Sequence, residues 1–163
     1  DEEIRARFGD TVEAALRGEL DDWAARPEDR VALVLLLDQF PRNLFRGDGR
    51  AFAGDAEALR HCRDALAAGE LETLATPLRY FLLMPLMHAE DPTCQRECVR
   101  RYTELRDARG PRPSAFYAGG VEWAVRHAQA IERLGRFPAR NAALGRSTTP
   151  EEAAFLAEHP SGF

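Results

Sequence analysis

The chain has 163 residues, of which 45% are hydrophobic and 30% charged, a balance that predicts one soluble globular domain over residues 1–163. The net charge of −5 argues against a general nucleic-acid binder, which needs a basic surface, and no apolar run is long enough to span a bilayer. All basic side chains are arginine, which excludes Schiff-base chemistry and phosphate loops that require lysine.

Apolar residues recur at helical spacing along the chain, and no segment shows the alternation of a half-buried strand. We therefore predict an all-α fold of about seven helices. In chain order the predicted helices cover residues 1–18, 27–39, 51–68, 76–89, 91–109, 114–134 and a last segment from 149. Pro41 is expected to end or kink the second helix, and Pro85 to kink the fourth. Residues 110–113 are expected to form a loop.

The stretch 33–47 joins the most apolar run of the chain to a dense polar group. Its first five residues, LVLLL, leave no polar face, so this segment is expected to be buried all round. The polar residues that follow are Asp38, Gln39, Arg42, Asn43 and Arg46. One interpretation is structural, with an Asp38–arginine ion pair and amides that seal backbone groups. The other is an arginine fork that binds a carboxylate or a phosphate.

A second polar group follows the predicted fourth helix and consists of His88, Glu90 and Asp91. Asp91 is well placed to cap the next helix, and Glu90 can contribute to the same helix start. Alternatively, a histidine with two nearby carboxylates can bind a metal or act as a general base.

A third polar group lies near the C-terminal end of the chain and contains His127, Arg136, Arg140, Asn141 and Arg146. His127 falls on a predicted helix, where a hydrogen-bonded core histidine is the structural interpretation. The arginines lie in a loop rich in glycine, proline and aromatic residues. They either tie backbone carbonyls together or form an anion site.

Two of these groups share a short motif. FPRN at residues 40–43 returns as FPARN at residues 137–141, and each copy leads into a helix. Two helix–turn units with similar corners indicate stacking of the kind found in helical repeats.

The three cysteines are Cys62, Cys94 and Cys98. Their odd number and irregular spacing predict free, buried or half-buried thiols in a reducing cytoplasm. Because no second Cys or His pair occurs at a suitable spacing, we predict no metal site.

Five segments carry a resemblance to a known family: LLLDQFPRNLFRG (35–47), RAFAGDAEAL (50–59), YFLLMPLMHAED (80–91), RHAQAIERLGRFPARN (126–141) and LGRSTTPEEAAFL (144–156). Together they make the chain similar to the bacterial DUF924 family over nearly its whole length. The resemblance implies an all-helical, tetratricopeptide-like fold and no established activity. It also implies a Trp- and Phe-rich segment upstream of residue 1, and a family histidine where this chain has Ala139.

Two functional hypotheses follow. The first is a cytoplasmic helical protein that binds a small anionic molecule in an Arg-, His- and Asn-rich pocket, either as a binding protein or as an enzyme. Its acid–base residues would be His88, His127, Glu90 and Asp91. Its ligand-binding residues would be Gln39, Arg42, Asn43, Arg46, Arg136, Arg140, Asn141 and Arg146. The second hypothesis is a helical adaptor for a partner protein or peptide, in which the arginine corners are structural. Neither hypothesis names a cofactor or an oligomeric state, and neither includes nucleic acid or membrane as a partner.

Overall fold

The computed structural model describes residues 2–110 and 114–159, and the chain forms two compact units, residues 1–85 and 86–163. The described residues contain helices and connecting segments and no strand, which confirms the all-α prediction. The boundary between the units falls within the short helix α6 (Met84–His88). Whether residues 1–163 behave as one domain stays a prediction, as does stacking of the tetratricopeptide kind.

The N-terminal unit contains an apolar cluster to which its first four α-helices contribute. Its α-helices are α1 (Glu2–Leu16), α2 (Pro27–Val34), α3 (Phe40–Leu44), α4 (Asp55–Ala67) and α5 (Thr76–Leu82). Short 3₁₀ turns cover Asp21–Ala25, Gly49–Phe52 and Glu70–Thr73. The buried cluster consists of Val12, Ala15, Leu33, Leu36, Leu37, Leu44 and Ala58. Four residues of the apolar run that starts at Leu33 are buried, whereas Leu35 is half-buried, so the prediction of burial all round holds for most of the run.

The chain does not leave helical geometry at Pro41, contrary to one of the two expected outcomes. A π-helical turn, Leu35–Gln39, follows α2 and leads directly into α3. Pro41 has no N–H to give to the carbonyl of Leu37 four residues earlier. The wider π turn accommodates the proline without ending the helix.

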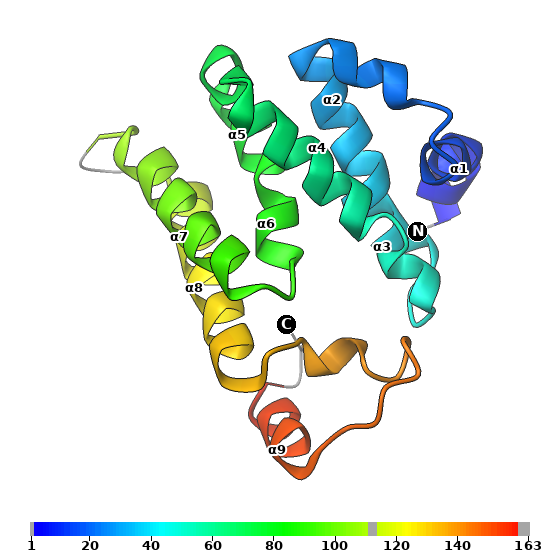
Figure 1. Ribbon diagram of the computed structural model, residues 1–163, viewed down its shortest axis with the longest axis vertical. Coiled ribbons are helices and arrows are strands. Elements are labelled where there is room, and N and C mark those ends of the chain that lie inside the picture. The colour runs from blue at the N-terminus through cyan, green and yellow to red at the C-terminus, as the bar shows by residue number, and fades with distance from the viewer. Residues whose placement is uncertain (1, 111–113, 160–163) are drawn as a thin grey trace. The chain divides into compact units, whose positions relative to one another are not determined.

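The C-terminal unit is built on a hairpin of two long helices, α7 (Pro92–Asp107) and α8 (Ala115–Leu134) (Figure 1). A 3₁₀ turn, Pro138–Arg140, and the last helix, α9 (Pro150–Glu158), pack against each other after the hairpin. A second apolar cluster, Ala130, Ile131, Phe137 and Phe155, lies where these segments meet. This cluster fixes the loop that carries the third polar group.

Helix boundaries differ from the predicted ones where proline and capping decide them. The helix expected over residues 76–89 is split into α5 and α6, a break next to Pro85 that agrees with the predicted kink. Asp91 caps α7, and Thr149 with Glu152 forms a capping box at α9. Ser114 stands at the start of α8 without a side-chain capping bond. The expected loop 110–113 lies largely outside the described residues.

Within residues 2–110 and 114–159, no helix is both long enough and apolar enough to span a membrane.

Candidate functional site

The first polar corner lies in the N-terminal unit and is closed by ion pairs. Arg42 donates two hydrogen bonds to the Asp55 carboxylate, at 2.8 and 2.9 Å, and a third to the backbone carbonyl of Asp38. The same guanidinium lies 3.3 Å from the carboxylate of Asp38, which is fully buried. The structural interpretation of an Asp38–arginine pair is therefore observed. Asp55 is an additional partner, brought in by α4, that lies beyond the local motif.

The amides of this corner also bond locally. Gln39 donates its Nε2 to the Asp38 carboxylate, and Asn43 donates its Nδ2 to the carbonyl of Gln39 at 3.2 Å. Arg46 is exposed. Contact of these side chains with a ligand stays a prediction.

Two histidines of the C-terminal unit, His88 and His127, lie close together and are here called the histidine pair. Their ring centroids are 6.1 Å apart, and both side chains are half-buried. The ring of His127 also lies edge-on to Phe137 at 5.3 Å and to Trp123 at 6.1 Å. α6 and α8 thus bring together histidines that are 39 positions apart in the sequence.

The hydrogen bonding of His127 fixes which nitrogen of the imidazole can react. Its Nδ1 lies 2.8 Å from the backbone carbonyl of Trp123. Because a carbonyl oxygen only accepts hydrogen bonds, Nδ1 carries the hydrogen of the neutral ring. The lone pair is then on Nε2, the atom that can accept a proton.

A carboxylate–guanidinium pair, Glu90 with Arg146, holds the segment next to the histidine pair. Arg146 donates to both oxygens of Glu90, at 2.7 and 3.0 Å, and to the carbonyl of Phe137. The backbone N–H of Phe137 donates to Glu90 at 2.8 Å. Burial acts to raise the pKa of Glu90, but these hydrogen bonds and the charges of Arg146 and Arg140 outweigh it and hold the pKa below its usual value. Glu90 is therefore an anchored anion at neutral pH.

Arg140 and Asp91 contact the backbone around His88 and Cys94. Arg140 donates to the carbonyl of His88 at 2.8 Å, and its guanidinium lies 4.7 Å from the ring centroid of Phe137. The Asp91 carboxylate accepts the N–H of Cys94 at 2.8 Å, the capping geometry that its position predicts.

Arg136 and Asn141 bond to Glu152 at the start of α9. Arg136 donates to both Glu152 oxygens, at 2.5 and 3.0 Å, and Asn141 donates to the same carboxylate at 3.2 Å. The hydrogen bonds from Arg136 and from the backbone N–H of Thr149 lower the pKa of Glu152 to about 2. Glu152 was not among the sequence candidates, although the capping-box pattern identifies its position.

The structure offers little for a metal. Among residues 2–110 and 114–159, no three His, Cys, Asp or Glu side chains are grouped so that they could hold an ion. Cys62, Cys94 and Cys98 are buried and form no disulfide among the described residues, which agrees with the prediction of buried thiols.

The sequence candidates divide into two sets, one in each unit of the chain. One set lies in the N-terminal unit: Asp38, Gln39, Arg42, Asn43 and Arg46. The other lies in the C-terminal unit: His88, Glu90, Asp91, His127, Arg136, Arg140, Asn141 and Arg146.

Gln95 is, like Glu152, a buried polar residue next to the second set that was not among the sequence candidates. Its sequence position carries a signal, because it shares the buried face of α7 with Cys98 and Tyr102, three and seven residues later.

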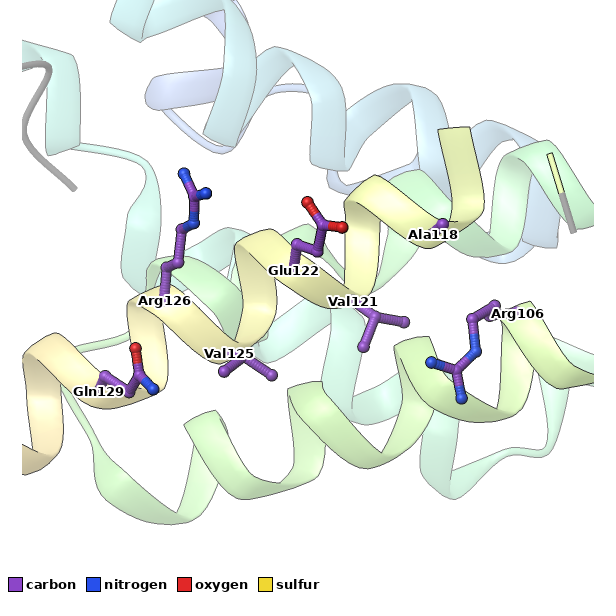
Figure 2. A pocket seen from close by; sticks show the side chains of 7 residues that line it. All are labelled: Arg106, Ala118, Val121, Glu122, Val125, Arg126 and Gln129. Atoms are coloured by element: carbon purple, nitrogen blue, oxygen red, sulfur yellow. The ribbon is translucent and has the colours of Figure 1, made fainter. Parts of the chain in front are cut away.

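A shallow groove of about 420 Å³ runs along α8 beside α7. Val121 and Val125 point toward α7, and Arg106 reaches toward them from that helix (Figure 2). Glu122 and Arg126 project from the other side of α8 in the same view. Val125 is 37% exposed.

The chain matches the family described as "Bacterial protein of unknown function (DUF924)" over residues 1–160. It belongs to the DUF924 family. A solved structure similar to this DUF924 chain is that of a protein of unknown function from Agrobacterium tumefaciens, with 39% sequence identity and a TM-score of 0.78. The similarity covers 97% of this chain and 84% of that one. No curated protein matches the chain.

Proposed function

We propose that this DUF924 protein binds a small anionic molecule at the histidine pair and that His127 exchanges a proton with it. The observation that carries the proposal is the hydrogen bond from His127 Nδ1 to the Trp123 carbonyl. It leaves Nε2 as the proton acceptor, in an imidazole whose ring is held between His88 and Phe137. A positioned imidazole of this kind is the commonest general acid or base in enzymes.

Charge supports an anionic ligand. Arg140 donates to the backbone carbonyl of His88, so a permanent positive charge lies beside one histidine of the pair. Protonation of either histidine adds positive charge at the same place. An anion is therefore favoured over a neutral or cationic molecule by the electrostatics of the segment.

The other predicted residues of this unit have supporting roles in the proposal. Glu90 and Arg146 neutralise each other and fix the backbone of Phe137, against which His127 packs. Asp91 fixes the start of α7. Glu90 and Asp91 are thus scaffold for the proton transfer, whereas His88 and His127 contact the ligand. Cytoplasmic localisation belongs to the same proposal.

Native mass spectrometry of the protein isolated from a bacterial host tests ligand binding directly. We expect a 1:1 extra mass on the 18.2 kDa chain that is reduced at least about tenfold in occupancy by His127→Asn, because a lost charged hydrogen bond is worth that much. His159→Asn is the matched control, since His159 stacks on Phe155 in another part of the same unit. Retention of the same mass by both His88→Asn and His127→Asn would contradict the proposal.

The groove beside α7 favours a second candidate, binding of a partner peptide. We propose for this alternative an apolar helix that lies along α8 and contacts Val121 and Val125. On this reading the arginine pairs of both units are structural, in agreement with their internal contacts.

Two substitutions separate the two candidates. Val125→Asp places a charge in the groove and would abolish capture of a partner by the purified protein, whereas His127→Asn would leave capture unchanged. Loss of capture in His127→Asn with retention in Val125→Asp would reject the groove as the partner site.

A further inference from the structure

The C-terminal end of α6, where His88 lies, is held by a buried side chain of the neighbouring helix. Gln95 is 2% exposed. Its Nε2 donates to the carbonyls of Met87 and Ala89, both at 2.8 Å, and lies 3.3 Å from the carbonyl of Leu86. These carbonyls are acceptors that a helix end leaves without intrahelical donors.

The remaining carbonyl in this run belongs to His88 itself, and it accepts from Arg140. Two side chains therefore hold the four consecutive carbonyls 86–89. A helix of five residues has no stability of its own, so its last turn depends on such outside contacts. The direction in which the His88 side chain leaves the backbone is set by the same four peptide groups.

Burial of the Gln95 side chain costs more free energy than burial of an apolar side chain would. It occupies the apolar face of α7 beside Cys98 and Tyr102, and its Oε1 is buried without a hydrogen-bond partner among the described residues. An apolar side chain of the same length would avoid the cost of that unpaired acceptor. The amide therefore contributes something other than burial, and it donates to the carbonyls of Met87 and Ala89, the two neighbours of His88 in the chain.

We propose that Gln95 is a positioning residue that fixes the imidazole of His88 relative to that of His127. This inference rests on the proposed role of the histidine pair as the ligand site. Gln95 itself touches no ligand in this proposal; it acts through the carbonyls of α6.

Gln95→Met tests the proposal, because methionine keeps the length and burial of the side chain and removes both amide donors. We would record histidine ring signals by NMR at one fixed pH, without any added anion. The expected result is a shifted or doubled His88 signal, with the His159 signal unchanged. The helical content by circular dichroism should stay at the wild-type value.

Cys98→Ala is the matched control, since it shortens a buried side chain on the same face of α7 one turn later and leaves the amide of Gln95 in place. It should leave the His88 signal in place. A His88 signal that is unchanged in Gln95→Met, or that changes equally in Cys98→Ala, would overturn the positioning role.

A wild-type measurement covers the case in which Gln95→Met fails to fold. The side-chain amide protons of Gln95 should exchange slowly with deuterated water, because Nε2 donates to buried carbonyls. Rapid exchange would overturn the inference. These readouts use the protein without a ligand, so they are separate from the mass-spectrometric test, in which retention of the bound mass by both His88→Asn and His127→Asn would reject the proposed function.

Discussion

Arginine acts in this protein chiefly as a connector between backbone and carboxylate. Arg42, Arg136 and Arg146 each donate both to an acidic side chain and to a carbonyl. The planar guanidinium suits this use because its five donors lie in a fixed fork, whereas lysine presents a single compact charge. Arginine alone can therefore hold the irregular segments of this chain, which has no lysine, by donating to both carboxylates and backbone carbonyls.

Arg146→Met should destabilise the protein by about 2 kcal/mol, because it removes two charged hydrogen bonds from the partly buried Glu90 carboxylate. Chemical denaturation followed by circular dichroism measures the change. The control is Arg126→Met, which alters an exposed arginine over Trp123 and should stay within about 0.5 kcal/mol of wild type. Equal stabilities of the two variants would show that the Glu90–Arg146 pair is not a structural pin.

The π-helical turn after α2 requires a glycine at the start of α4. The carbonyl of Leu37 cannot bond to Pro41, and it faces the backbone of Gly54 at the start of α4. A Cβ atom on Gly54 would lie 2.3 Å from the oxygen of Leu37, far inside van der Waals contact. Glycine is needed here because two backbones approach closely, not because of its φ angle.

Gly54→Ala should therefore destabilise the protein by about 3 kcal/mol, the upper part of the usual range for overpacking, since the opposing atom is backbone and cannot rotate away. Thermal unfolding measures the loss. Gly119→Ala provides the opposite expectation: nothing lies within 4 Å of its added Cβ in α8, so it should stabilise by about 0.5–1 kcal/mol. A neutral Gly54→Ala would mean that α4 and the π turn are not in close contact.

The start of α9 should make stability depend on pH. The pKa of Glu152 is about 2 in the folded chain and 4.5 in the reference state, so the unfolded chain binds more protons between these values. The stabilising contribution is complete above pH 4.5 and is lost as the pH falls toward 2. The melting-temperature difference between wild type and Glu152→Gln should follow this window. A difference that does not change between pH 6 and pH 3 would contradict the role of the carboxylate.

At the scale of the whole molecule, the chain is two helical units, each of which contains an apolar cluster, and it carries an excess of acidic residues. A net charge of −5 repels the phosphate backbone of nucleic acids, and counterion release cannot compensate without a basic face.

We expect no binding of a fluorescent DNA duplex at low salt, where electrostatic attraction would be strongest. Fluorescence anisotropy gives the answer directly. A salt-sensitive rise in anisotropy would reveal a basic face that the net charge conceals.

The sequence predicts the helical class, most helix ends and the ion pair of Asp38 with Arg42, because these depend on local spacing and capping. It does not predict the π turn, since proline alone is compatible with either a helix end or a distorted helix. It also misses Asp55 and Gln95, whose partners are set by packing between helices. His88 and His127 come close together only when the C-terminal unit folds. Local motifs therefore identify the two histidines as candidates but do not predict that they are neighbours.

The most direct test of the proposed function is the tautomer of His127, measured by long-range ¹H–¹⁵N NMR on histidine-labelled protein above the pKa of imidazole. The hydrogen bond to the Trp123 carbonyl predicts hydrogen on Nδ1 and a lone pair on Nε2. On lowering the pH, Nε2 should then take up the proton. A neutral His127 with its hydrogen on Nε2 would contradict the assignment and remove the proton acceptor from the proposed site.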